Sequence, residues 1–257
     1  MGNVQYDFKN KLVMVSAGGK GIGRAIVDSF LESGAMVASF SRSIEETRQD
    51  NLLLMKGDIN DHNFLESFHR EVVGHFIQDV DILVNNNGGP PPGLALSFDD
   101  QDWLEAIQNN FMSTLQMIRL VVDGMKVNEW GRIINLTSAS AKEPAAGMAL
   151  SNVTRASVAS LSKTLSISLG GDGITVNTIL TGGVKTERFD SLVENQIEET
   201  GETFNEAMKR INATLPVNFI ATPEQFSRYI LFLASDDASY LTGASISIDG
   251  GASKSLF

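Results

Sequence analysis

Short apolar runs alternate with longer segments of helical periodicity along the whole chain. The runs are almost continuous in apolar residues, which is typical of strands buried on both faces of a sheet. We expect strands at residues 12–15, 36–40, 52–55, 82–85, 132–136, 175–180 and 244–248. The intervening segments predict helices at residues 22–33, 63–76, 100–127, 151–169, 190–212 and 223–234.

This alternation predicts an α/β fold, a doubly wound parallel sheet of about seven strands with helices on both faces. No linker, low-complexity segment or repeat divides the sequence, so we expect one domain over residues 1–257. Ligands of such sheets bind at the carboxyl ends of the strands. A longer insertion at residues 187–216 follows a strand end and has apolar residues at helical intervals, which predicts a helical lid over a substrate.

Two of the predicted helices have more apolar or small-residue surface than a sheet-covering helix needs. Residues 100–127 spread apolar side chains around more than one face, and residues 151–169 are crowded with Ala and Ser, which permit close helix approach. A helix that covers one side of a sheet needs only one apolar stripe. We therefore expect a homodimer or homotetramer joined through these helices. Deep burial within a monomer is the alternative.

A glycine-rich turn joins the first predicted strand to the first predicted helix. Glycine lets the backbone bend sharply and approach an anion, whose charge is then stabilised by the free N–H groups of the helix N-terminus. Because a strand and a helix flank the glycines as this mechanism requires, the turn predicts a nucleotide site. Its candidate residues are Ser16, Gly18, Gly19, Lys20, Gly21, Ile22 and Gly23.

The composition narrows the range of partners. The 257 residues, 42% of them apolar and 20% charged, are typical of a globular protein, and a net charge of −11 argues against nucleic-acid binding. No apolar run is long enough to cross a bilayer, residues 1–10 have no secretory signal, and the chain has no cysteine. We expect a cytoplasmic protein that acts on a small molecule, with no metal and no membrane or nucleic-acid partner.

The end of the second predicted strand indicates which nucleotide is bound. An acidic residue at this place would bind the 2′-hydroxyl of NAD, but the chain has Ser41 and Arg42, which suit a 2′-phosphate. Lys20 could add to the phosphate site. We therefore expect NADP in preference to NAD; a solvated surface role for Arg42 is the alternative. Asp58 and Ile59 follow the third strand, and residues 85–88 (Asn-Asn-Asn-Gly) follow the fourth, so the nucleotide could extend across all three strand ends.

Several separate motifs, in order, resemble the short-chain dehydrogenase/reductase family over nearly the whole chain. The family's Thr-Gly-x-x-x-Gly-Ile-Gly is matched by residues 16–23, with Ala17 in place of the first glycine. Its Asn-Asn-Ala-Gly is matched at residues 85–88, and its closing Asp-Gly-Gly at residues 249–251. The resemblance implies a Rossmann-like fold, a nicotinamide dinucleotide and hydride transfer between alcohols and carbonyl groups.

The resemblance also implies roles for individual residues. Asn110, seven residues after Trp103, matches the family's active-site asparagine, and Ser138 matches its catalytic serine. Asp58 matches the family aspartate at the adenine. The family's Pro-Gly-x-Val-x-Thr, which contacts the nicotinamide, reads Thr-Gly-Gly-Val-Lys-Thr at residues 181–186. The resulting set of cofactor-binding residues is completed by Asn85, Asn86, Gly88, Val184 and Thr186.

The match fails at the family's Tyr-x-x-x-Lys pair. Ser151 stands at the tyrosine position and Arg155 at the lysine position. A related branch that reduces carbon–carbon double bonds separates its Tyr and Lys by six residues, but Lys163 would then need a tyrosine where Ala156 stands. Ser151 and Arg155 are therefore the residues expected at the two catalytic positions.

This change alters the expected chemistry. Carbonyl reduction needs a proton at oxygen, and a tyrosine with a pKa of about 10, lowered by a lysine, can supply one near neutrality. A serine hydroxyl is far less acidic, and arginine is effectively always charged. Arg155 can still form hydrogen bonds to ribose hydroxyls, so we expect cofactor binding to survive.

Other residues leave the proton donor open. Lys142 and Glu143 follow Ser138 in a strand-end loop, where either could act as a general acid or could be simply solvated. We therefore expect an NADP-dependent oxidoreductase of carbonyl or alcohol groups with an altered proton-donor arrangement. The alternative is a catalytically inactive NADP-binding sensor or partner subunit.

Overall fold

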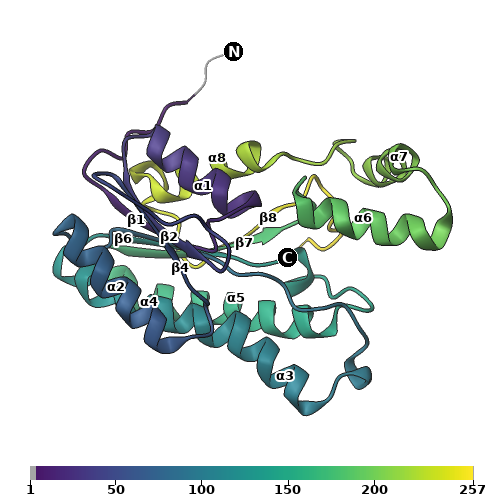
Figure 1. Ribbon diagram of the computed structural model, residues 1–257, viewed down its shortest axis with the longest axis horizontal. Coiled ribbons are helices and arrows are strands. Elements are labelled where there is room, and N and C mark those ends of the chain that lie inside the picture. The colour runs from purple at the N-terminus through teal and green to yellow at the C-terminus, as the bar shows by residue number, and fades with distance from the viewer. Residues whose placement is uncertain (1–3, 257) are drawn as a thin grey trace.

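The computed structural model describes residues 4–256, without the side chain of Glu199 (Figure 1). One eight-stranded sheet crosses this part of the chain in the order β3-β4-β2-β1-β5-β6-β7-β8. The strands are β1 (Leu12–Ser16), β2 (Met36–Ser41), β3 (Thr47–Gln49), β4 (Leu52–Lys56), β5 (Ile82–Asn86), β6 (Gly131–Leu136), β7 (Ile174–Thr181) and β8 (Ser245–Ile248).

Each strand predicted from the apolar runs is present, and all of them pair in parallel. The eighth strand is β3, which pairs antiparallel with β4 at the edge of the sheet. The sheet therefore has one short antiparallel strand in addition to the expected parallel strands, which were predicted to number about seven. The sequence of β3, Thr-Arg-Gln, is polar and half-buried to exposed, so no apolar run marks it.

The strand order reverses between β1 and β5. From β1 the chain moves outward through β2 to β4, and from β5 it moves the other way through β6 and β7. In register, Val13 of β1 pairs with Val37 of β2 on one side and Ile82 of β5 on the other. Crevices at such reversal points, at the carboxyl ends of the strands, are where open α/β sheets bind ligands.

Helices cover both faces of the sheet (Figure 1). On one face lie α1 (Gly21–Glu32) and α8 (Pro223–Ala234), which bury Ile26, Phe30 and Phe226 in one apolar core. On the other lie α2 (His62–Phe76), α4 (Ser113–Val127) and α5 (Ala149–Leu169) over a second core. Short 3-10 segments occur at η1 (Ala95–Ser97), η3 (Ala139–Ala141), η4 (Gly170–Asp172) and η5 (Asp236–Ala238).

The helix predicted at residues 100–127 contains a change of winding. It consists of α3 (Asp100–Ile107), a π-helical turn η2 (Gln108–Met112) and α4. Single π-turns inside α-helices occur often at functional sites. This one holds Asn110. Leu104 and Ile107 of α3 are exposed, as is Val153 of α5, but the assembly through these helices stays a prediction.

The insertion forms two helices where one was predicted at residues 190–212. They are α6 (Glu187–Thr200) and α7 (Phe204–Thr214), which lie together beyond the end of the sheet (Figure 1). Gly201, with φ of 72°, ends α6, and Thr203 begins α7 through a reciprocal cap with Glu206. The single-helix prediction was wrong because it followed apolar spacing and overlooked these two signals. Within residues 4–256, no helix combines the length and apolar character needed to span a membrane.

Candidate active site

The glycine turn has the tight geometry expected of an anion cradle. Side chains at Gly18 and Gly23 would overlap Ser39 Oγ and the Ala17 carbonyl oxygen, respectively. Gly21 has φ of 56°, and Ala17 has φ of 52°, a left-handed conformation that a residue with a Cβ rarely adopts. The N-cap of α1, Lys20, has no side-chain cap bond, so the first N–H groups of the helix stay open to a ligand.

Ser16 joins the glycine turn to the end of β5. Its Oγ accepts a hydrogen bond from Asn86 N at 2.8 Å and donates to Asn87 Oδ1 at 3.1 Å. Asn86 Nδ2 lies 3.4 Å from the Ala17 carbonyl oxygen and 2.5 Å from where a Gly23 side chain would begin. The turn and the Asn-Asn-Asn-Gly segment therefore form one hydrogen-bonded unit on both sides of the strand-order reversal.

The end of β2 carries the two residues predicted to select the cofactor. Ser41 Oγ is buried and has no hydrogen-bond partner among the described residues. It lies so close to Gly19 that any side chain there would overlap it. Arg42 is exposed and forms no ion pair within residues 4–256. An unpaired hydroxyl against the glycine turn, followed in sequence by an exposed arginine, fits a phosphate group.

Lys20 has a partner of its own. Its Nζ lies 3.2 Å from Glu187 Oε2, and both side chains are largely exposed. This ion pair joins the glycine turn to the first residue of α6. The expected contact of Lys20 with a phosphate stays a prediction, and it would compete with Glu187.

Asp58 and Ile59 lie after β4, at the same edge of the sheet. Asp58 is half-buried, and its Oδ1 accepts a hydrogen bond from Asn60 N at 3.0 Å, so it also stabilises its own turn. Ile59 packs against the core under α2 and α4. Their expected contact with the adenine stays a prediction.

Asn85 and Asn87 lie at and just after the end of β5, where their side chains form hydrogen bonds to neighbouring elements. Asn85 Nδ2 donates to Asn135 Oδ1 at 2.8 Å, while Asn85 Oδ1 is buried without a partner among the described residues. Asn87, where the family motif has alanine, is buried, and its Nδ2 lies 2.8 Å from Ser113 Oγ. The side chain of Asn87 therefore anchors the end of β5 to the start of α4, a role that the sequence analysis missed.

Asn110 is fully buried in the π-turn. Its Nδ2 donates to the Ala106 carbonyl oxygen at 3.2 Å, and its Oδ1 has no partner within residues 4–256. Its backbone carbonyl accepts from Thr114 Oγ1 at 2.7 Å. A buried amide oxygen without a donor is unusual, so Asn110 remains open to a further hydrogen bond.

Three serines form a chain of hydrogen bonds beside β6. Ser138 Oγ accepts from Ser140 N at 3.2 Å, and Ser140 Oγ lies 3.2 Å from Ser151 Oγ. Ser151, the residue expected at the tyrosine position, is buried, and its hydroxyl is already paired with Ser140. Sequence reasoning linked Ser138 to Ser151 but missed Ser140, which connects them.

Arg155 is buried between the ends of β5 and β6. Its Nη2 donates to the Asn87 carbonyl oxygen at 2.8 Å, and its Nη1 donates to the Leu136 carbonyl oxygen at 3.2 Å. Burial, and then the nearby Arg188, lower the pKa of Arg155 to about 10, so it stays charged at neutral pH. Its Nε is buried without a partner among the described residues. Arg155 thus places a positive charge with unused donors at the predicted nicotinamide end.

Val184 and Thr186 lie where the chain leaves β7 for α6. Val184 is buried and bridges to Ala221, and Thr186 caps α6 by accepting from Phe189 N at 3.2 Å. The Cγ2 atom of Thr186 is 3.2 Å from where a Gly21 side chain would begin. The start of α6 therefore contacts the glycine turn.

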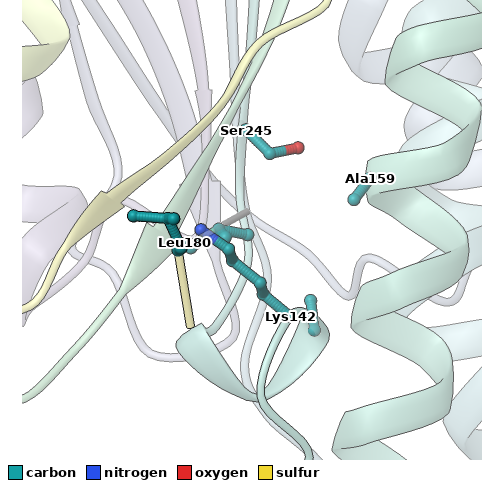
Figure 2. Close-up of a pocket in the computed structure, with 6 residues that line it drawn as sticks. Lys142, Ala159, Leu180 and Ser245 are labelled. Carbon is teal, nitrogen blue, oxygen red and sulfur yellow. The ribbon is translucent and has the colours of Figure 1, made fainter. Parts of the chain in front are cut away.

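Lys142 and Glu143, the alternative general acids, each contact other parts of the chain. Glu143 Oε2 accepts from Lys254 N at 2.7 Å and so holds the C-terminal segment. Lys142 lines a cavity of about 420 Å³ with Ala159, Leu180 and Ser245 (Figure 2). None of the predicted catalytic or cofactor residues lines this cavity. Within residues 4–256, no three metal-ligating side chains gather into a cluster.

Comparisons with known proteins identify the family of this chain and bear on its cofactor. A family model described as "Enoyl-(Acyl carrier protein) reductase" matches residues 16–253. The NADPH-dependent reductase BacG of Bacillus subtilis (strain 168) is 28% identical over an alignment of 257 positions, which spans 96% of this chain and 99% of BacG. The 3-oxoacyl-[acyl-carrier-protein] reductase FabG of Haemophilus influenzae is 28% identical over 251 residues, with 95% and 98% covered.

A solved structure extends the agreement to the fold. The crystal structure of YwfH, an NADPH-dependent reductase involved in bacilysin biosynthesis, matches with a TM-score of 0.87 at 27% identity, covering 96% of this chain and 99% of YwfH. The predicted Rossmann-like fold is confirmed, and NADPH in the names of BacG and YwfH agrees with the NADP predicted from Ser41 and Arg42. This chain belongs to the short-chain dehydrogenase/reductase family.

Proposed function

We propose that this chain is an NADPH-dependent reductase of carbonyl groups that works without a tyrosine acid. The observation that carries the proposal is Arg155: a buried guanidinium, held on the carbonyl oxygens of Asn87 and Leu136, keeps positive charge and unused donors at the family's lysine position. Ser138 stands two residues beyond Leu136. The names of the relatives as reductases favour an enzyme over the inactive binding protein.

The residues at the carboxyl ends of the strands fit NADPH. The open N–H groups of α1 suit the pyrophosphate, and Ser41 with Arg42 suits the 2′-phosphate. Asp58 and Asn86 border the space expected for the adenosine, while Val184, Thr186 and Arg155 border that for the nicotinamide riboside. When bound, NADPH supplies a hydride.

Ser138 and Arg155 would handle the charge that reduction puts on the substrate. As the carbonyl carbon gains a hydride, the electron pair of the C=O double bond moves to oxygen. A hydroxyl and a guanidinium, fixed in advance by the fold, can donate hydrogen bonds to this oxyanion, and fixed donors of this kind are worth about 10²–10³ in rate each.

The proton would then come from water. Ser151 is paired with Ser140, and the serine chain from Ser138 to Ser151 contains no group acidic enough to release a proton at neutral pH. Arg155 keeps its proton because its pKa of about 10 lies above neutrality. This division of labour favours carbonyl substrates whose alkoxide is stabilised by a neighbouring electron-withdrawing group, such as 1,2-diketones.

The test is consumption of NADPH by the purified protein with a panel of ketones, diketones and oxo acids. We expect turnover that Ser138→Ala lowers by about 10²-fold or more. Ser160→Ala, an exposed serine on α5, is the control and should leave the rate unchanged. If only the Ser151→Tyr/Arg155→Lys double variant turned over, the natural chain would be a binding protein and the proposal would fail.

A further inference from the structure

Two arginines from distant parts of the chain approach the same glycine. Arg155, on α5, reaches the end of β5 through the Asn87 carbonyl oxygen at 2.8 Å. Arg188, the second residue of α6, donates from Nη2 to the Gly89 carbonyl oxygen at 3.2 Å. A carbon atom at the missing side chain of Gly89 would lie 3.1 Å from Arg188 Nη2 and 3.7 Å from Arg155 Nη2. The two guanidiniums therefore lie close together against the backbone of Gly89.

No carboxylate of the described residues neutralises this pair. Neither Arg155 nor Arg188 forms an ion pair within residues 4–256, and Glu187, beside Arg188 in sequence, is paired with Lys20. Arg155 is only 6% exposed, whereas Arg188 is solvent-exposed and its charge is screened by water. A buried cation without a counter-ion is costly, and a second cation beside it adds repulsion. An anion that accepts hydrogen bonds from both guanidiniums would relieve both penalties.

From this geometry we infer that Arg155 and Arg188 form a subsite for a carboxylate of the substrate, next to the carbonyl group that is reduced. The inference rests on the proposed function. Arg155 is shared between the carboxylate and the reacting oxygen, so the two groups must be neighbours in the substrate, as in 2-oxo acids. Arginine has five N–H donors, and Arg155 uses two of them on backbone oxygens.

The position of Arg155 favours a carboxylate over the cofactor's pyrophosphate, although Arg188 lies near the start of α6, which contacts the glycine turn. The open N-terminus of α1 already offers an anion site at the glycine turn. Arg155 instead contacts the Leu136 carbonyl oxygen, two residues before Ser138, on the β6 side of the strand-order reversal. Arg188 belongs to α6, so a bound carboxylate would also tie this helix to the core of the site.

The test uses two unreactive carboxylates, oxalate and benzoate, titrated calorimetrically into the protein with and without NADPH. We expect both to bind the NADPH complex. Arg188→Met should weaken this binding roughly 10- to 100-fold, as loss of a charge-assisted bond does. Arg228→Met removes an exposed arginine on α8, outside the residues predicted to bind the cofactor, and should have no effect. Arg188→Lys should weaken binding less than Arg188→Met does, because lysine keeps the positive charge but lacks the planar, paired N–H donors of the guanidinium.

A second measurement separates the substrate from the cofactor. Arg188→Met should raise KM for 2-oxo acids but not for their methyl esters, and should leave the dissociation constant of NADPH unchanged. Weaker NADPH binding with unchanged oxalate binding would assign Arg188 to the pyrophosphate and overturn the inference. Equal carboxylate binding by Arg188→Met and Arg228→Met would also overturn it. Failure of the natural chain to bind NADPH would contradict the proposed function instead, and the titration without cofactor would still test the arginine pair.

Discussion

The two halves of the candidate site differ in how closely they follow the family pattern. At the nucleotide half, the glycine turn, Ser41 and the Asn-Asn-Asn-Gly segment all lie together, and a buried hydroxyl and an exposed arginine stay without partners there. At the proton-transfer half, Ser151 is already bonded to Ser140, and Arg155 is already bonded to two backbone carbonyls. The first half is open to a ligand, while in the second the two altered residues are built into the protein.

This difference shows how one half can keep its function while the other changes. The glycine turn depends on the absence of side chains, which leaves few tolerated substitutions. A buried tyrosine or lysine can be replaced if the polar atoms of the new residue find hydrogen-bond partners in their surroundings. Ser140 is such a partner for Ser151, and the carbonyl oxygens of Asn87 and Leu136 are such partners for Arg155. The proposed function therefore predicts that binding and proton transfer are separable in this fold.

The largest expected effect breaks the nucleotide half alone. In Gly23→Ala, the new Cβ would overlap the Ala17 carbonyl oxygen, so the turn must open and NADPH binding should be lost. The free energy of unfolding should fall by about 1–3 kcal/mol. Gly74→Ala on α2 meets open space and should instead raise it by about 0.5–1 kcal/mol. Denaturant titration and NADPH fluorescence measure both; retained binding in Gly23→Ala would refute the assigned turn.

A somewhat smaller effect is expected at the proton-transfer half. Arg155→Met removes the proposed oxyanion donor and should lower kcat about 10²–10³-fold. Arg155→Lys keeps the charge and should retain more of the rate. The pKa of Arg155 is lowered to about 10, so in the natural chain the charge persists below that pH and is lost as pH rises through it. A pH profile that stays flat above 10 would argue against the role of Arg155.

A third effect concerns the preference of the nucleotide half for NADPH over NADH. Arg42→Glu should weaken NADPH binding about 10- to 100-fold, because a charge-assisted hydrogen bond is worth about 1.5–3 kcal/mol, and should leave NADH binding little changed. Arg70→Glu makes the same charge change at an exposed position on α2 and serves as the control. Competition between the two cofactors measures the ratio. Equal weakening by both variants would point to a general charge effect.

The smallest effect concerns backbone strain in the turn. Ala17 has φ of 52°, where the family motif has glycine. Ala17→Gly should raise the free energy of unfolding by about 1 kcal/mol, because a left-handed conformation costs a Cβ-bearing residue about 1–2 kcal/mol. Its NADPH affinity should stay the same. A stability loss measured by thermal unfolding would mean that the Ala17 side chain has packing that outweighs the strain.

Much of the fold was predictable because apolar runs and glycine spacing report local structure directly. The strand β3 was not, since Thr-Arg-Gln has no apolar pattern, and the break between α6 and α7 was overlooked although Gly201 and the Thr203–Glu206 cap mark it. The missed site residues share another cause. Ser140 and Asn87 act through contacts between segments far apart in the chain, which a single sequence does not reveal.

The most direct test of the central claim is to follow the hydride itself. The protein would be incubated with NADPH that carries deuterium at the transferred position, together with pooled diketones and 2-oxo acids, and the products analysed by mass spectrometry. The account predicts deuterium on the former carbonyl carbon with the natural chain and with Ser151→Ala, and far less with Arg155→Met. Deuterated product from the Ser151→Tyr/Arg155→Lys variant alone would contradict it.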